Sequence, residues 1–396
     1  MRVLLAYSGG LDTSYLVAWY ARERVADVTT LAVDCGGWSD AERAELERRA
    51  LTLGAVEHRL VDARGELFER VLRWLVAANV RRGETYPLCV GAERGLQAEI
   101  IARTAADEGF DIVAHGSTGA GNDQVRFDAA LHALAPEVTL EAPVRDHALS
   151  RAEEAGYLAA LGHAYPAERE RYSINAGLWG VSIGGGELAT SGGALPEHAW
   201  HWTRGGAGER TLELAFEHGR PVAIDGEPYD PVDLIERLNR IGGELGVGRG
   251  YHLGDTLLGF KGRIAFEAPA ACLLLAAHRE LEKLVLTEEQ RFWKDHLGNV
   301  YGRRLHQGLF HDPFQRDLEA FFASSQARVT GAVRVAVQGG ACLVEGVESP
   351  FSLMTRSDAV YGELPSQRSS GGAALARTLA EPARLWRLAG LGPQTA

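Results

Sequence analysis

The stretch VLLAYSGGLDTS at residues 3–14 decides the fold of the first part of this chain. Its apolar start is typical of a buried strand, and the residues after the glycine pair have the apolar spacing of a helix. In an open α/β sheet, ligands collect at the carboxyl end of such a strand. Gly9 and Gly10 are therefore either a simple turn or a cradle for phosphate, because glycines let the backbone approach an anion and the free amides of a helix start favour it.

The side chains of this stretch favour the cradle. Ser8, Thr13 and Ser14 can donate hydroxyl hydrogen bonds to phosphate, and Asp12 can hold a metal ion or order the loop. Two other phosphate loops are excluded, because the stretch has neither the lysine of a Walker loop nor the G-x-G-x-x-G spacing of a dinucleotide site.

Short apolar runs alternate with helical patterns through residues 1–165, which predicts an α/β nucleotide-binding domain with a mostly parallel sheet and helices on both faces. Ser150 and Glu153 form a capping-box pattern that opens a last helix, ending near residue 161. Strands are expected over 3–7, 28–33, 57–61 and 111–115, and helices over 13–24, 41–53, 66–80 and 92–109.

The pattern of residues 166–365 predicts a second domain, of mixed α+β type. Residues 172–207 are rich in Gly, Ser and Trp without clear periodicity, which predicts ordered loops that contribute to a site. Residues 366–396 are expected to start flexible and to end in a helix over 381–388, as a C-terminal oligomerisation tail. Strands are expected over 211–216 and 220–224, a hairpin over 332–337 and 341–347, and helices over 231–241, 272–286 and 314–330.

The composition of the chain indicates which kinds of binding partner to expect. The 396 residues carry a formal net charge of −12, which argues against nucleic acid because such binding depends on clustered Lys and Arg. The four cysteines form no C-x-x-C pair, so they are expected to be reduced and mostly buried, and no metal ligands are predicted among them. The sequence shows no leader pattern and no run of about 18 apolar residues, which predicts a cytoplasmic protein without a membrane partner.

Two sequence motifs resemble those of a known family. AYSGGLDTS (6–14) is similar to the pyrophosphate loop of the ATP pyrophosphatases in the form used by argininosuccinate synthases, and AHGSTGAGNDQVRF (114–127) resembles a second signature of that family. RYSINAGLWGVSIGGGEL, HQGLFHDPF and QARVTGAVRVAVQGGACLVEGVESPFSL resemble later family segments, so the resemblance covers essentially the whole chain.

The resemblance implies a ligase that uses Mg²⁺ and ATP. It would attach AMP to the ureido oxygen of citrulline, release pyrophosphate, and let the amino group of aspartate displace the AMP. It also implies a homotetramer. The residues implied for ATP are Ala6, Tyr7, Ser8, Gly9, Gly10, Leu11, Asp12, Thr13, Ser14, Val33 and Gly116; for aspartate Thr118, Asn122 and Asp123; and for citrulline Tyr86, Asn122, Arg126, Ser173 and Ser182. Of these, Ser8, Asp12, Thr118 and Asp123 are the candidate catalytic residues.

The chain departs from the family mainly in the citrulline pocket. Val90 and Gly91 replace two hydroxyl residues, the family's glutamate falls at Gly254, and its tyrosine falls at Phe266. Asp255, one place along, is a candidate to replace that glutamate. Elsewhere, Gly37 replaces a glutamine, and Ala120 replaces a lysine of the phosphate-side loop.

Three hypotheses follow from this pattern. The first is an argininosuccinate synthase with a divergent pocket. The second keeps the adenylation and the aspartate attack but takes another ureido, carbamoyl or amide acceptor, because a polar pocket that loses its partners discriminates against the ligand that needed them. The third, from a different class, is a regulatory protein that binds ATP without turnover, which the loss of lysine at Ala120 supports.

Overall fold

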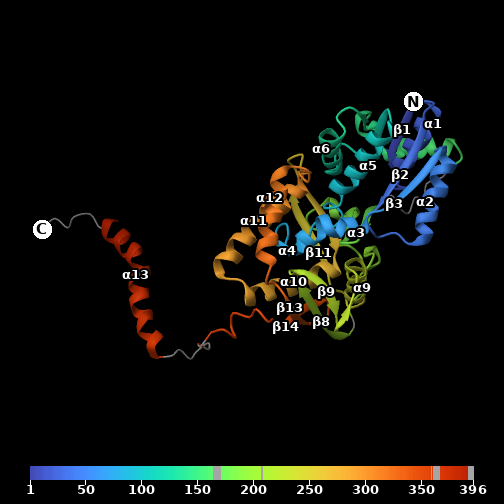
Figure 1. Cartoon of the computed structure of the whole chain (residues 1–396). Coiled ribbons are helices and arrows are strands. Elements are labelled where there is room, and N and C mark those ends of the chain that lie inside the picture. The colour runs from blue at the N-terminus through green and yellow to red at the C-terminus, as the bar shows by residue number, and fades with distance from the viewer. Residues whose placement is uncertain (164–170, 207, 358, 360–365, 391–396) are drawn as a thin grey trace. The chain divides into compact units, whose positions relative to one another are not determined.

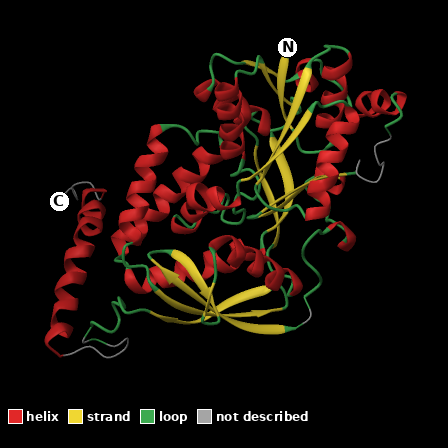
Figure 2. Cartoon of the chain, turned by 45° about the vertical axis from the view of Figure 1, so that its right-hand side comes forward, coloured by secondary structure: helices red, strands yellow, loops and turns green. Residues whose placement is uncertain are grey.

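The computed structural model describes residues 1–163, 171–206, 208–357, 359 and 366–390. It divides into two compact units, Met1–Phe351 and Ser352–Ala396. The first unit contains a parallel sheet and two antiparallel sheets with their helices (Figures 1 and 2). The expected α/β fold with a second α+β part is confirmed, whereas the domain boundaries at 165 and 365 stay predictions.

The parallel sheet has the strand order β3-β2-β1-β4-β5. The chain builds it outward from β1 to β3 on one side and then returns to place β4 on the other side of β1. The sheet therefore has a topological switch point between β1 and β4, where such folds bind ligands. Its strands are β1 (Arg2–Ala6), β2 (Asp27–Asp34), β3 (Glu57–Asp62), β4 (Ile112–His115) and β5 (Thr139–Glu141).

Helices cover both faces of this sheet. Val3 and Leu5 of β1 pack with α1, α2 and α8, whereas Leu4 points to the opposite face and joins the core with α5, as the two-residue period of a strand requires. The helices of this part are α1 (Leu11–Arg22), α2 (Asp40–Leu53), α3 (Arg64–Leu67), a π-helical turn (Phe68–Leu72), α4 (Arg73–Ala77), α5 (Arg94–Glu108), α6 (Asp123–Leu134), α7 (Pro143–Asp146) and α8 (Arg151–Ala160).

The second sheet has the antiparallel order β10-β9-β8-β13-β14. It confirms the strand pair and the hairpin that turns at Gly339 and Gly340, both of which have positive φ. Its strands are β8 (Glu209–Glu217), β9 (Arg220–Ile224), β10 (Glu227–Pro228), β13 (Gly331–Gln338) and β14 (Ala341–Glu348).

A third sheet, β11-β12-β7-β6, corrects the sequence-based prediction of loops over residues 172–207. Two of its strands, β6 (Tyr172–Gly177) and β7 (Gly180–Gly185), pair as an antiparallel hairpin inside that segment. Their glycines hid the alternation that normally indicates strands. Short 3₁₀ turns at Gly186–Ala189 and Glu197–Ala199 follow β7. The other two strands of the sheet are β11 (Arg249–Asp255) and β12 (Lys261–Glu267).

Four longer helices complete the first unit. Asp230 caps the first of them by accepting a hydrogen bond from the Val232 amide at 3.0 Å, with Pro231 at the first helical position, as predicted. The third was not predicted, although Thr287 and Gln290 form a capping box at its start. These helices are α9 (Pro231–Glu244), α10 (Pro269–Val285), α11 (Glu288–His306) and α12 (Pro313–Gln326).

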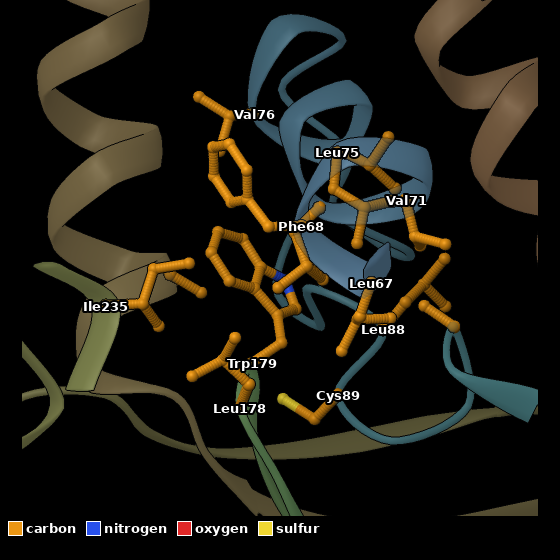
Figure 3. Packing of buried hydrophobic residues seen from close by; sticks show 14 of the residues in the cluster. Leu67, Phe68, Val71, Leu75, Val76, Leu88, Cys89, Leu178, Trp179 and Ile235 are labelled. Atoms are coloured by element: carbon orange, nitrogen blue, oxygen red, sulfur yellow. The ribbon is translucent and has the colours of Figure 1, made fainter. Parts of the chain in front are cut away.

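Trp179, in the turn between β6 and β7, belongs to the main hydrophobic core. Its side chain is fully buried beside Phe68 and Leu178 (Figure 3), and its indole Nε1 donates to the Pro87 carbonyl oxygen at 2.9 Å. This one side chain therefore fixes the β6–β7 turn against the segment at Pro87, directly after the predicted citrulline residue Tyr86.

The second unit contains α13 (Ser366–Gly390). The helix begins well before residue 381, so the expectation of a flexible start over the Ser369–Gly372 region is wrong within the described residues. Leu375, Leu379 and Trp386 are exposed on it. Among all helices in the described ranges, none has the length and apolar character needed to cross a membrane.

Candidate functional site

The loop after β1 and the loop after β4 meet at the switch point of the parallel sheet. Gly9 has a φ of +70°, and Gly10 is extended and precedes the first turn of α1. A Cβ at Gly116 would lie 3.0 Å from Thr13 Cγ2 and 3.2 Å from Asp12 Cβ, so a side chain there would push the two loops apart by a few tenths of an ångström. The structure thus brings together the residues that the sequence predicted for phosphate.

The hydroxyl groups of this loop have few partners of their own. Ser8 Oγ and Thr13 Oγ1 lie 3.4 Å apart. Ser14 is fully buried, and its Oγ has no hydrogen-bond partner among the described residues. A buried hydroxyl without a partner is costly, so this group is suited to an oxygen atom that arrives with a ligand.

Asp12, in the first turn of α1, lies beside Glu154 of α8. Burial and, next, the Asp12 carboxyl raise the pKa of Glu154 to about 8. A protonated Glu154 hydrogen-bonds to the Asp12 carboxyl group, which is one cause of its raised pKa. The sequence did not predict Glu154, whose only signal was its place in the capped first turn of α8.

These carboxylates fit a magnesium ion that arrives with a nucleotide. Mg²⁺ takes one or two protein carboxylates together with phosphate oxygens and water, rather than a cage of protein ligands. The described residues contain no group of three or more His, Cys, Asp or Glu side chains placed to hold a metal. Asp12 is the residue that would contact the ion.

The remaining residues that the sequence predicted for the nucleotide lie at the ends of β1 and β2. Ala6 ends β1, and Tyr7, Leu11 and Val33 are buried around it. Gln97 Nε2 donates to the Val33 carbonyl oxygen at 3.5 Å.

Beyond Val33, the Leu178 amide donates to the Cys35 carbonyl oxygen at 2.7 Å, which joins the parallel sheet to the β6–β7 turn. At Gly37, with a φ of +91°, a Cβ would lie 2.7 Å from the Ala176 backbone. The backbone of β6 thus fills the space that a glutamine side chain would need.

Asp123 begins α6 and is held by two arginines. Its carboxylate accepts from Arg94 Nε at 3.0 Å and from Arg126 Nη1 at 2.7 Å. Burial opposes ionisation of Asp123, but the charges of Arg94 and Arg126 outweigh it and lower its pKa to about 2. Sequence reasoning missed Arg94, which is separated from Asp123 by most of α5 and all of β4.

The two neighbours of Asp123 in the second signature differ in their surroundings. Asn122 Oδ1 accepts from the Leu257 amide at 2.9 Å, which ties the loop to the β11–β12 turn. Thr118 is exposed on the same loop. Asn122, Asp123 and Arg126 therefore share one side of the loop and the start of α6.

One face of the third sheet carries the predicted citrulline serines. Phe266 of β12 is the register partner of Ser182 in β7, and Ser182 in turn pairs with Asn175 of β6. Ser173 lies two residues from Asn175 and so shares that face. Arg94 Nη2 reaches Asn175 Oδ1 at 3.4 Å, so this face is turned toward Asp123. The opposite face packs on a core of its own.

Tyr86 and His252 form an aromatic wall at the end of this face. Their rings are stacked, with centroids 5.3 Å apart and 24° between planes, and the centroid of Phe266 lies 5.3 Å from that of Tyr86. Tyr86 is buried, and its hydroxyl donates to the Cys89 carbonyl oxygen at 2.6 Å. The structure thus brings Tyr86, Ser182 and Phe266 together from three distant segments.

Arg126 is bound to a histidine that sequence reasoning missed. Its Nε donates to the His306 carbonyl oxygen at 3.0 Å, and its Nη2 lies 2.8 Å from His306 Nδ1. Arg82 Nη1 lies 3.4 Å from the same Nδ1. Nothing in the local sequence of either Arg82 or His306 indicated a site, because they are brought together only by the packing of α11.

Comparison with known proteins agrees with this geometry. The model described as "Arginosuccinate synthase N-terminal HUP domain" matches residues 2–163, and the one described as "Arginosuccinate synthase C-terminal domain" matches residues 172–378. The chain belongs to the argininosuccinate synthase family. This makes it an ATP-dependent carbon–nitrogen ligase by class.

Curated relatives extend the match along both chains. The argininosuccinate synthase of Methanocaldococcus jannaschii is 39% identical over 363 residues, which are 91% of either chain. That of Metallosphaera sedula is 38% identical over 94% of this chain and 95% of its own. That of Xanthomonas axonopodis pv. citri is 38% identical over 91% of this chain and 88% of its own. The family resemblance read from the two signatures is confirmed.

Proposed function

We propose that this protein condenses aspartate with citrulline or a related ureido acceptor in an AMP-forming reaction. The ureido oxygen attacks the α-phosphorus of ATP, the bond from that phosphorus to the bridging oxygen breaks, and pyrophosphate leaves. The neutral amino group of aspartate then attacks the activated ureido carbon, and AMP leaves with the oxygen. Two protons are released, and no group is oxidised or reduced.

The loop Ser8–Ser14 holds the phosphates in this proposal. The backbone at Gly9 and Gly10 admits them, the amides at the start of α1 face them, and Ser14 Oγ gains the acceptor that it lacks. Asp12 would hold Mg²⁺, which would supply positive charge to offset that of the phosphates. Gly116 keeps the second loop close enough to cover the nucleotide, and Val33 lies beside its adenosine.

Aspartate and the acceptor lie between the second signature and the third sheet. Thr118, Asn122 and Asp123 bind aspartate, and Asn122 also bounds the acceptor site with Tyr86, Arg126, Ser173 and Ser182. The protein's contribution is to align the ureido oxygen with the α-phosphorus and then to present the amine, because positioning and charge stabilisation supply most of the catalysis in such transfers. The reaction requires no covalent protein nucleophile.

One observation supports the proposal most strongly. The glycine-bounded loops after β1 and β4 converge at the switch point, and the buried Ser14 Oγ there lacks a partner among the described residues. A regulatory protein that binds ATP would keep this group as well, so the observation supports nucleotide binding. Membership of a ligase family favours turnover over regulation.

The test is an assay for AMP, pyrophosphate and the condensed product. Purified protein is incubated with Mg²⁺, ATP, aspartate and a ureido acceptor, and omission of aspartate or its replacement by glutamate is the control. We expect equal amounts of AMP and product that depend on aspartate. Formation of ADP and phosphate instead, or ATP binding with no AMP from any ureido acceptor, would overturn the proposal and favour the regulatory hypothesis.

A homotetramer is part of the same proposal. Exposed Leu375, Leu379 and Trp386 on α13 support it, because an apolar helix face is normally covered by a partner. Sedimentation analysis of the full chain tests this, with a monomer as the contrary result. The cytoplasmic location stays a prediction.

A further inference from the structure

Arg82, Arg126, His252 and His306 form a cluster around the proposed acceptor site, and we call it the Arg–His cluster. Both guanidinium groups point at His306 Nδ1, at 3.4 Å from Arg82 and 2.8 Å from Arg126. His252 adjoins the cluster through its stacking on Tyr86. Arg82 also donates to the Asp255 backbone oxygen at 2.7 Å, which fixes its head beside β11.

The two imidazoles each present an unpartnered nitrogen. Guanidinium groups only donate hydrogen bonds, so His306 Nδ1 must accept and the hydrogen of the neutral ring must lie on Nε2. Burial, followed by the charges of Arg126 and Arg82, lowers the pKa of His306 to about 3, so the ring is neutral at physiological pH. His306 and His252 are 5% and 8% exposed, and the Nε2 of each lacks a partner among the described residues.

The carboxylates that neighbour the Arg–His cluster are already engaged. Asp123 is shared by Arg94 and Arg126. Asp255 turns its carboxylate to Lys261 at 2.5 Å and is exposed, so it does not replace the glutamate expected at Gly254. At Gly254 itself, a Cβ would lie 2.5 Å from His252 Nε2, which means that the imidazole occupies the space a side chain would enter.

The positive charges of Arg82 and Arg126 would attract the α-carboxylate of citrulline and repel its α-ammonium group. The α-carboxylate can accept from guanidinium and imidazole N–H groups, which are strong donors to an anion. The α-ammonium would meet two arginines at close range in a partly buried site, where like charges repel strongly. A ligand with the carboxylate and without the ammonium would give the N–H of His306 Nε2 an acceptor and avoid this repulsion.

We propose that the preferred acceptor is a ureido or carbamoyl acid whose far end is anionic and carries no free ammonium. This inference rests on the proposed function, because it names the substrate class of that site. The Arg–His cluster is the specificity determinant, and Arg82 and His252 bind the anion.

The test compares citrulline with deamino-citrulline, in which hydrogen replaces the α-ammonium and nothing else changes. Binding is measured by calorimetry on the full chain with Mg²⁺ and a non-hydrolysable ATP analogue, and kcat/KM is measured separately with ATP and aspartate. We expect deamino-citrulline to bind about tenfold more tightly or better, because the repulsion is removed. Equal or tighter binding of citrulline would overturn the inference, whatever the turnover.

Two variants locate the effect. Arg82→Gln should weaken binding of deamino-citrulline about tenfold, because a charged hydrogen bond to the carboxylate is lost. The neighbouring Arg81→Gln removes the same charge from the chain outside the cluster and should leave the affinity unchanged. His252→Glu should reverse the preference toward citrulline. Equal effects of the Arg81 and Arg82 changes would count against the cluster.

The binding and turnover results also separate the two proposals. Selective binding without AMP formation from either compound would support the acceptor class and overturn the proposed ligase activity. AMP formation with a preference for citrulline would support the ligase activity and overturn the proposed acceptor class.

Discussion

The Glu154 carboxyl group lies against that of Asp12, so that α8 contributes an acid to the first turn of α1. Two carboxyl groups this close do not both ionise readily, and burial adds to the effect. Glu154, beside the phosphate loop, is therefore largely protonated near neutral pH. Binding of a magnesium ion with its nucleotide would change the protonation of Glu154.

Glu154→Gln should alter how stability depends on pH. The pKa of Glu154 is about 8 in the folded protein against an ordinary value of 4.5. A raised pKa means that the contribution to stability is complete below the unfolded value and is lost as pH rises through the folded one. Urea unfolding from about pH 5 to about pH 9 should therefore show a steeper loss for the natural protein than for the variant. Glu137→Gln, an exposed change, is the control, and parallel curves for all three proteins would contradict the assignment.

Gly9→Ala should destabilise the protein by about 1–3 kcal/mol without any ligand. The positive φ of Gly9 is unfavourable for alanine, and the added carbon would overlap Leu46 Cδ2. Gly10→Ala is the matched control, because Gly10 has a negative φ and its nearest atom would be Ser8 Oγ at 3.4 Å. Chemical denaturation distinguishes them, and equal losses would show that the loop geometry is misassigned.

Ser14→Ala should separate binding from stability. Its buried hydroxyl has no partner among the described residues, so removal should leave the free energy of unfolding unchanged or slightly higher. The KM for ATP should rise about tenfold or more, because a hydrogen bond to phosphate is lost. Thermal unfolding and initial rates measure the two effects. A destabilised variant with an unchanged KM would assign Ser14 a structural role only.

Trp179→Ala should cost about 3–5 kcal/mol of stability, as expected for a large side chain removed from a core. Trp179 is fully buried and hydrogen-bonded to Pro87, whereas Trp293 is 52% exposed and supplies the control Trp293→Ala. Because Trp179 holds the β6–β7 turn, the KM for the acceptor should rise as well. Denaturant unfolding and acceptor titration test this, and similar stabilities of the two variants would refute it.

The nucleotide half of the site could be predicted from the sequence because its signals are local. A strand, a glycine pair and a helix lie within residues 2–22, and the packing of Gly116 on Thr13 then follows from the parallel topology. Even here the prediction stopped short of Glu154, which reaches the loop only through the packing of α8 on α1.

In the acceptor half, the family resemblance named residues such as Tyr86 and Ser182, but their contacts could not be predicted because they come from separate parts of the chain. The pairing of Phe266 with Ser182 depends on the third sheet, whose glycine-rich strands lack a readable alternation. His306 reaches Arg126 across 180 positions. The capping box at Thr287 was a missed local signal for α11, but it would not have placed His306 beside Arg126.

The hydrogen bond from the Leu178 amide to the Cys35 carbonyl oxygen joins the parallel sheet, which we propose holds the nucleotide, to the third sheet, which we propose bounds the acceptor. Residues on β7 and β12 can change the chemistry of the acceptor side without disturbing the register of β1 or β2. In such a fold, a few substitutions in these strands could change the acceptor specificity while the ATP-binding loop keeps its sequence and structure.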